Sequence, residues 1–138
     1  MYKENAGLNI NAVNTNEDGS HDIGLMQIND EGAGKDKFFG LDMTKIPWQD
    51  NWAVNIVAGA AYYAYLYYNF AISEEGPLGY GYERGSIDAH RSAYSMYNGG
   101  MDDGDRFNHV DPYNIPSVNL SDNEFLNWMG FWSGGLGF

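Results

Sequence analysis

The side chains of this sequence that can do chemistry are carboxylates, amides, tyrosine hydroxyls and three histidines. Cysteine is absent, which excludes a thiolate nucleophile, a disulfide framework and Cys-ligated zinc. His21, His90 and His109 show no metal-ligand spacing. The acidic run at residues 102–105, with Asp111, lacks the spacing and the terminal Glu of an EF-hand, so we expect a solvated loop there. The residues therefore predict no metal site.

Four short segments of distinctive sequence follow one another along the chain. They read ENAGLNINAV at residues 4–13, GLMQIN at 24–29, NIVAGA at 55–60 and YSMYNGG at 94–100. This ordered set resembles the soluble lytic transglycosylase domains of the lysozyme-like superfamily, which are related to goose-type lysozymes. One segment alone is weak evidence, whereas four in order are specific. The resemblance implies cleavage of the β-1,4 bond between N-acetylmuramic acid and N-acetylglucosamine in peptidoglycan, without a cofactor.

The resemblance assigns the catalytic acid to Glu4. A glycosidase of this type needs a carboxylic acid that protonates the leaving oxygen, and an apolar environment raises the pKa of a carboxyl enough for that role. In the family the same carboxylate then acts as base on the sugar's own 6-hydroxyl. This leaves a 1,6-anhydro product and needs no second carboxylate. Glu17 and Glu31 match no segment of the pattern, and we expect them to be solvated loop charges.

Five further residues are expected to bind the glycan in a groove: Gln27, Met26, Tyr97, Asn98 and Tyr94. The amides of Gln27 and Asn98 can pair with N-acetyl groups or ring hydroxyls. Tyr97 can place its hydroxyl against Glu4 or the substrate, and the apolar wall can come from Met26 and the two tyrosines. Each residue also has a plain structural interpretation, because Gln27 can cap a turn, Asn98 can end a helix and Tyr97 can lie in the core.

Two features depart from the family pattern. Asn5 stands where the family has serine, and only three residues precede Glu4, where relatives carry a helix. We therefore expect this chain to be a domain cut from a longer protein. Candidates for positioning a water, as an acid does in goose-type enzymes that hydrolyse, are Asp18, Asp22 and Asp30. A solvated turn is the plainer interpretation of these acids, so hydrolysis and transglycosylation both stay open.

Composition restricts the partners. The 138 residues include 19 Asp and Glu against seven Lys and Arg, which gives a net charge of −12. This acidity argues against nucleic acid as a partner and against docking on anionic lipid by charge. Residues 1–5 have no apolar segment behind them, so no signal peptide is expected in this chain. The expected partner is the glycan strand of peptidoglycan at the bacterial cell wall, reached outside the cytoplasm or from a virion.

The elements expected to position these residues are mainly helical. Residues 52–70 contain only Asn55 and Asn69 as strongly polar groups, which predicts a central helix with partners on nearly all sides. Residues 86–97 predict a second helix, and residues 121–124 have capping-box spacing before a third. The predicted fold is mainly α, a lysozyme-like helical bundle around the central apolar helix, with long loops and at most a small β-hairpin. Residues 1–132 form the predicted domain and 133–138 a Gly-rich tail or linker.

Two other classes of function stay open. The chain can be a non-catalytic lysozyme-like module that binds glycan or serves a larger phage, secretion or conjugation machine, and Asn5 and the short start favour this alternative. The other alternative is a membrane-active protein whose apolar ending, residues 125–138, inserts into lipid. We expect that ending to pack on the fold instead. Equal release of muropeptides by the wild type and by Glu4→Gln would exclude the enzyme.

Overall fold

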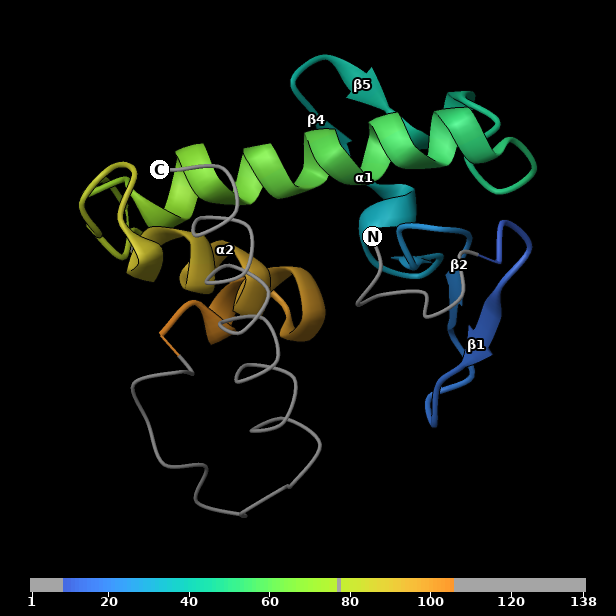
Figure 1. Cartoon of the computed structure of the whole chain (residues 1–138), viewed down its shortest axis with the longest axis horizontal. Helices are drawn as coiled ribbons and strands as arrows, with labels where there is room; N and C mark the ends of the chain where they lie inside the picture. Colours follow the sequence, from blue (N-terminus) through green and yellow to red (C-terminus); the bar gives the residue numbers. More distant parts are fainter. Residues whose placement is uncertain (1–8, 77, 106–138) are drawn as a thin grey trace, which may run out of the picture. The chain divides into compact units, whose positions relative to one another are not determined.

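The computed structural model describes residues 9–76 and 78–105 (Figure 1). This part of the chain holds two α-helices, α1 (Trp52–Leu66) and α2 (Ile87–Gly99). Its strands are β1 (Val13–Thr15), β2 (His21–Ile23), β3 (Ile28–Asn29), β4 (Lys37–Phe38) and β5 (Leu41–Asp42). The chain divides into two compact units, Met1–Tyr62 and Tyr63–Phe138, and each is described by itself. Neither described helix has the length and apolar character that a membrane crossing requires.

A three-stranded antiparallel sheet in the order β1-β2-β3 forms the beginning of the first unit. Its register places Asn14 opposite Asp22 and Asp22 opposite Asn29. Directly opposed residues share one face of a sheet, so these three polar side chains form a row across the strands. The amide of Asn29 donates to the Asp22 carboxylate at 2.9 Å within this row.

The turn between β1 and β2 owes its shape to small polar residues. Backbone hydrogen bonds join Asn16 to Ser20 and to Gly19, and Gly19 takes a φ of +85°. The Asp18 carboxylate accepts from the N–H and the hydroxyl of Ser20, at 2.9 and 2.7 Å. Asp and Asn favour such turns because their side chains bond to the backbone two residues on. The strong turn signal at residues 18–19 therefore corresponds to a hairpin turn.

A second hairpin joins β4 and β5 through a two-residue loop. Both loop residues have positive φ, +48° for Phe39 and +76° for Gly40, as a type I′ turn requires. Phe38 is buried, whereas the Phe39 side chain is 59% exposed. Glycine adopts this backbone region freely, but phenylalanine does so only at a cost in free energy.

We expect Phe39→Asn to raise the free energy of unfolding by about 1 kcal/mol, because asparagine tolerates positive φ at this position of a type I′ turn. Thermal unfolding followed by circular dichroism measures the change. Phe39→Ala is the control, since it removes the ring without the gain in turn propensity. An asparagine variant no more stable than the alanine variant would contradict the strain at this turn.

The core of the first unit is formed by side chains from the sheet, the following turns and the start of α1. Its buried apolar members are Leu25, Ile28, Ala33, Phe38, Met43, Trp48 and Ala58. Ile28 and Met43 are among the largest side chains that are fully buried. Most of this core lies in segments of two or three regular residues joined by turns, so the packing of side chains rather than long elements holds the unit together.

The second unit is built on the end of α1, which continues as a π-helical turn over Tyr67–Ala71. The segment at residues 80–82 runs beside it, with backbone bonds from Tyr80 to Phe70 and from Tyr82 to Ala71. Helix α2 packs on the π-helical turn. Ser86, predicted as the first residue of this helix, instead caps its start by accepting from the N–H of residue 89.

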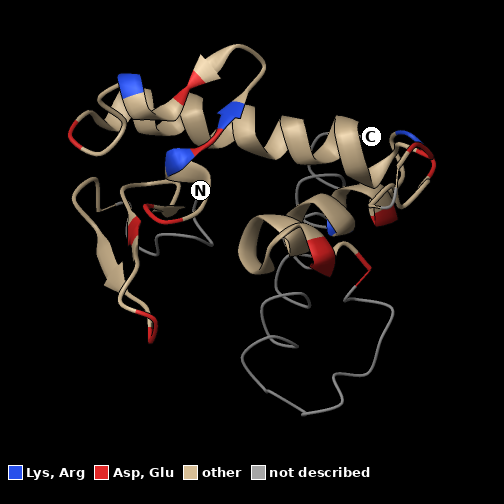
Figure 2. Cartoon of the chain, turned by 180° about the vertical axis from the view of Figure 1, so that it is seen from behind, with Lys and Arg blue, Asp and Glu red and all other residues tan. Residues whose placement is uncertain are grey.

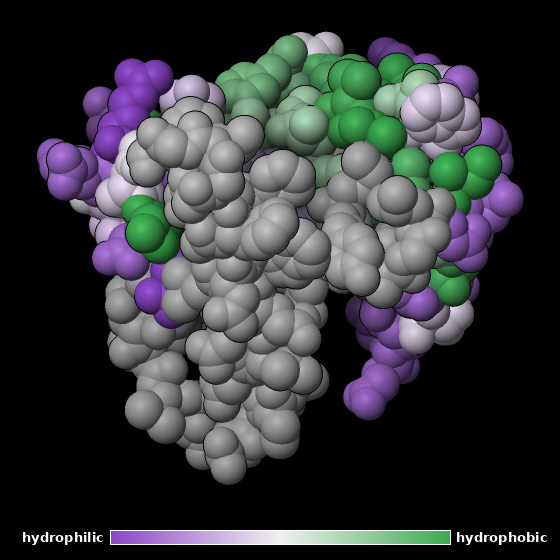
Figure 3. Space-filling model, in the orientation of Figure 1, coloured by the Kyte–Doolittle hydropathy of each residue, from purple (hydrophilic) through white to green (hydrophobic). Residues whose placement is uncertain are grey.

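The prediction of a helical bundle around a central apolar helix is wrong. Within residues 9–76 and 78–105, the two α-helices are accompanied by short helical turns and by two small antiparallel sheets. Helix α1 is not enclosed on all sides, because Trp52 is 55% and Val57 65% exposed, and Figure 3 shows apolar atoms at the surface along this helix. The prediction failed because apolar residues on an open helix face have the same sequence pattern as buried ones. The third predicted helix and the tail lie outside the described residues.

Candidate functional site

Asn55 joins two of the four distinctive segments. It is 1% exposed and lies in the first turn of α1. Its Oδ1 accepts from the N–H of Met26 at 2.9 Å, and its Nδ2 donates to the carbonyl of Ile23 at 3.0 Å and to that of Trp48 at 3.2 Å. The side chain thus satisfies one backbone group inside the turn at residues 24–27, which we call the 24–27 turn, and one directly before it. The lone polar group of an apolar helix is therefore a structural link to this turn.

Gly24 is required where the 24–27 turn meets Asn55. Its φ is +78°, and a Cβ added there would come within 2.5 Å of the side-chain atoms of Asn55. A real Cβ is never that close to another heavy atom, so any other residue would displace Asn55. Glycine serves here both for backbone conformation and for the close approach of another segment.

Gln27 ends the turn in the left-handed region, with φ +51°. Its Nε2 donates to the carbonyl of Gly24 at 2.7 Å, and its Oε1 accepts a short hydrogen bond from Nδ2 of Asn14 in β1. The side chain is 9% exposed. The bond to Gly24 makes Gln27 the cap of this turn, which is the structural interpretation given above. The neighbouring side chain of Met26 is half-buried, whereas Leu25 and Ile28 in the same segment belong to the core.

The three acids proposed to position a water all lie on the sheet or its turns. The hydrogen bonds from Ser20 hold the pKa of Asp18 below its ordinary value, and the backbone N–H of His21 does the same for Asp30. Asp30 also contacts Nδ1 of His21 at 3.0 Å. Asp22, in the central strand β2, accepts a hydrogen bond from the amide of Asn29 in β3. These carboxylates are thus hydrogen-bond acceptors already engaged with their own sheet.

Tyr94, Tyr97 and Asn98 lie on α2, in the second unit. Tyr94 is buried, Tyr97 half-buried and Asn98 exposed. The helix continues to Gly99, and the N–H of Gly100 bonds to the carbonyl of residue 96. The helix therefore ends two residues beyond the predicted residue 97, and Asn98 lies in its last turn.

A half-buried histidine of α2 lies among tyrosines elsewhere in the second unit. Nδ1 of His90 lies 3.1 Å from the Tyr63 hydroxyl, and its ring stacks on Tyr67 with 4.8 Å between centroids. Burial lowers the pKa of His90 and raises that of the Tyr63 hydroxyl. Both groups are therefore neutral at pH 7, and they serve the packing of α2 on the end of α1.

The structure brings together some of the predicted residues and not others. Met26 and Gln27 share the 24–27 turn, which is bonded to the third segment through Asn55. Tyr94, Tyr97 and Asn98 belong to the other unit. Glu4, the predicted acid, and Asn5 lie outside the described residues. The rival acids Glu17 and Glu31 are exposed, as predicted, and Glu31 pairs with Lys35.

Sequence reasoning missed the part played by Asn14 and that of Asn55. The signal for Asn55 was present, because a single amide among apolar residues of a helix must find partners when it is buried. Asn14 stands in a stretch with several other asparagines, at residues 5, 9, 11 and 16, and nothing in the sequence distinguishes it from them.

The other polar groups of residues 9–76 and 78–105 suggest neither a metal site nor a catalytic centre. No group of three His, Asp or Glu side chains in the described part of the chain could hold a metal ion. Acidic residues outnumber basic ones over the same residues (Figure 2). The pairs of Asp42 with Lys37 and Lys45 lie at the surface, and an exposed ion pair of this kind contributes little to stability.

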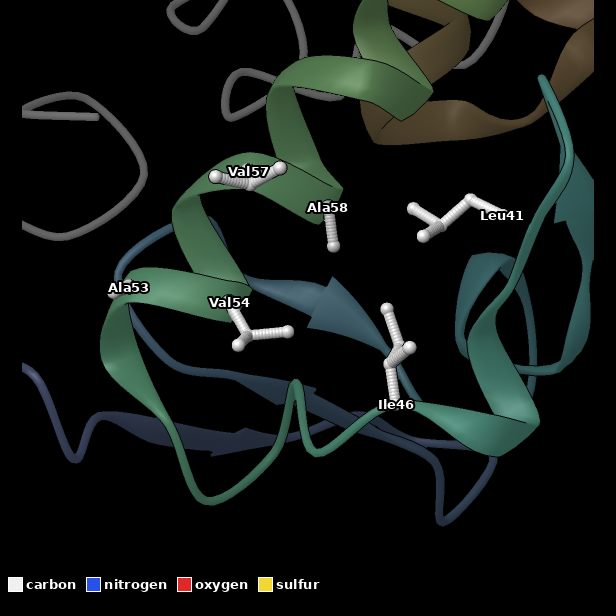
Figure 4. Close-up of a pocket in the computed structure, with 6 residues that line it drawn as sticks. All are labelled: Leu41, Ile46, Ala53, Val54, Val57 and Ala58. Carbon is white, nitrogen blue, oxygen red and sulfur yellow. The ribbon is translucent and has the colours of Figure 1, made fainter.

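An open groove of about 270 Å³ lies between α1 and the segment that follows β5 (Figure 4). It is lined by Leu41, Ile46, Ala53, Val54, Val57 and Ala58. The lining side chains are all aliphatic, so the groove offers neither a proton donor nor a hydrogen-bond partner for a sugar. It is therefore not the candidate site.

Comparisons with protein-family models, with curated proteins and with solved structures found no match for this chain. The resemblance to soluble lytic transglycosylase domains therefore rests on the four sequence segments.

Proposed function

We propose that this chain cleaves the β-1,4 glycosidic bond between N-acetylmuramic acid and N-acetylglucosamine in peptidoglycan, by lytic transglycosylation. The observation that supports the proposal best is the bonding of the second segment to the third. Asn55 lies 29 residues from Met26 and 32 from Ile23, yet it bonds to both. The two segments that match the family pattern in sequence are thus also in contact in the structure. The proposal rests on the segments and this contact, and not on the fold.

In this reaction Glu4 acts first as acid and then as base. Its proton goes to the leaving oxygen of N-acetylglucosamine as the bond from that oxygen to C1 of N-acetylmuramic acid breaks. The 6-hydroxyl of the same N-acetylmuramic acid then attacks C1, and its proton returns to the Glu4 carboxylate. The products are a free 4-hydroxyl end and a 1,6-anhydro end, with no water consumed and no metal or cofactor needed.

The other site residues keep the roles that the resemblance implies. Gln27 presents an amide of fixed orientation to the glycan, with Met26 beside it. The resemblance assigns glycan contacts to Tyr94, Tyr97 and Asn98 on α2 as well, of which Tyr97 and Asn98 are accessible and Tyr94 is buried. Asp18, Asp22 and Asp30 are the candidates for holding a water if the enzyme hydrolyses instead, although each already accepts hydrogen bonds within the sheet or its turns.

Mass spectrometry of digested peptidoglycan tests the reaction. Purified sacculi are incubated with the protein, and the soluble products are analysed before and after chemical reduction. We expect anhydro ends, which are lighter by one water than reducing ends and resist reduction. Reducing ends would show that the protein hydrolyses the bond, and they would contradict transglycosylation. Sedimentation of the protein with sacculi without soluble products would support the non-catalytic glycan-binding module and contradict the enzyme.

A further inference from the structure

The side-chain amide of Gln27 is held in one orientation by two opposite hydrogen bonds. Nε2 can only donate, and it donates to the carbonyl of Gly24 at 2.7 Å. Oε1 can only accept, and it accepts from Nδ2 of Asn14. If the amide rotated by half a turn, Oε1 would face the Gly24 carbonyl, which is a repulsive contact, and the bond to Nδ2 of Asn14 would be lost unless Asn14 also turned its own amide.

The two bonds leave a defined part of the amide for a ligand. A primary amide has two N–H donors and an oxygen with two lone pairs. The bonds to Asn14 and Gly24 use one donor and one lone pair of Gln27. One N–H and one lone pair therefore remain, and their directions are fixed by the neighbours. Such a group can distinguish a donor from an acceptor on a sugar, whereas an amide free to rotate cannot.

Of the two neighbours, only Asn14 holds Gln27 through a side chain. Gly24 contributes a backbone carbonyl from within the same turn. Asn14 is exposed and lies in β1, 13 residues away from Gln27 in sequence, with Asp22 opposite it in the sheet. Because the Asn14 side chain is exposed, it does not contribute to the packing of the core.

We propose that Asn14 is a positioning residue for the glycan, which it affects by fixing the orientation of the Gln27 amide. This inference rests on the proposed function, in which Gln27 contacts an N-acetylated sugar. Removing the Asn14 donor leaves the Gln27 amide held at Nε2 alone, by the Gly24 carbonyl, so Oε1 is no longer held and the amide presents itself to the sugar in more than one orientation. Binding of the glycan then weakens while the fold is kept.

The test measures the Kd for a soluble tetrasaccharide of alternating N-acetylglucosamine and N-acetylmuramic acid, by NMR titration. Glu4→Gln serves as the parent, so that the glycan is not consumed. We expect Asn14→Ala to raise the Kd roughly threefold to tenfold, the effect of one lost hydrogen bond. Asn11→Ala is the matched control, since Asn11 is also exposed and its side chain makes no bond like that of Asn14. It should leave the Kd unchanged.

A double-mutant cycle separates positioning from a direct or structural role. On a Gln27→Ala background, Asn14→Ala should have no further effect on the Kd, because Asn14 acts through the missing amide. Equal effects on both backgrounds would overturn the inference. The side-chain N–H signals of Gln27 give a reading that needs no ligand, and they should shift in Asn14→Ala and stay in Asn11→Ala. Unshifted signals, or a parent that binds no glycan, would also overturn it.

The outcomes distinguish this inference from the proposed function. If wild-type protein releases anhydro products and Asn14→Ala leaves the Kd unchanged, the role of Asn14 is wrong and the function stands. If the parent binds glycan and responds to Asn14→Ala, but the wild type releases nothing, then the glycan site is real and the catalytic proposal is wrong.

Discussion

Replacing Asn55 by leucine is expected to lower the free energy of unfolding by about 3 to 5 kcal/mol, as for the loss of a buried hydrogen-bond network. Leucine has nearly the same size but can neither donate nor accept. The N–H of Met26 and the carbonyls of Ile23 and Trp48 would each lose a partner at 2.9 to 3.2 Å. Because Asn55 is 1% exposed, water cannot replace it without opening the structure.

Urea unfolding followed by circular dichroism measures this loss. Asn69→Leu is the control, since Asn69 is the other strongly polar residue of the same apolar stretch but is exposed and bonds only to the carbonyl of residue 65. It should change the free energy of unfolding by no more than about 0.5 kcal/mol, as surface substitutions usually do. Equal stability of the two variants would contradict the structural link between α1 and the 24–27 turn.

The second large effect is expected at Glu4. Glu4→Gln keeps the size of the side chain but cannot supply or take up a proton, so we expect the release of soluble muropeptides to fall at least about 100-fold, within the range of acid–base catalysis. The rate of release from labelled sacculi measures it. Binding to sacculi should be retained, because the substitution removes the proton and not the glycan contacts.

Glu17→Gln is the matched control for that experiment. Glu17 is an exposed acid of the first unit that matches no segment of the family pattern, and its variant should release muropeptides at the wild-type rate. If Glu17→Gln abolished release and Glu4→Gln did not, the acid would be assigned to the wrong residue. If neither changed the rate, the cleavage would not depend on either carboxyl.

The helices could be predicted from the sequence because their signals are local. The apolar stretch at 52–70 corresponds to α1 and the π-helical turn that follows it, and the stretch at 86–97 to α2. The predicted ends of that stretch lie within two residues of the observed ends, Ile87 and Gly99. Periodicity and caps are properties of neighbouring residues, so no knowledge of the tertiary structure was needed.

The sheets could not be predicted in the same way. β1 to β5 have only two or three residues each, too few for an alternating pattern to show. Their surroundings are rich in Asn, Asp and Gly, which favour turns. Here those residues form the turns that bring the strands together, as Asp18 and Ser20 do between β1 and β2. The helical bundle was predicted because the strands gave no signal of their own.

The candidate site was predictable only in part. Gln27 and Gly24 were singled out by the GLMQ segment, but their partner Asn55 comes from the third segment and their partner Asn14 lies outside all four. A hydrogen bond between residues 13 or 29 positions apart leaves no mark in a single sequence. The positive φ of Gln27 is equally invisible, because glutamine seldom takes it unless its surroundings impose it.

Asn55 bonds to residues 29 and 32 positions before it, which affects when this part of the chain can fold during synthesis. A nascent chain that has emerged only as far as residue 50 already holds the whole GLMQ segment, but it lacks the side chain that closes the 24–27 turn. Closing a loop of about 30 residues costs chain entropy, and the first turn of α1 must exist before that cost is met. This part of the molecule therefore takes its final shape only after later residues have been synthesised.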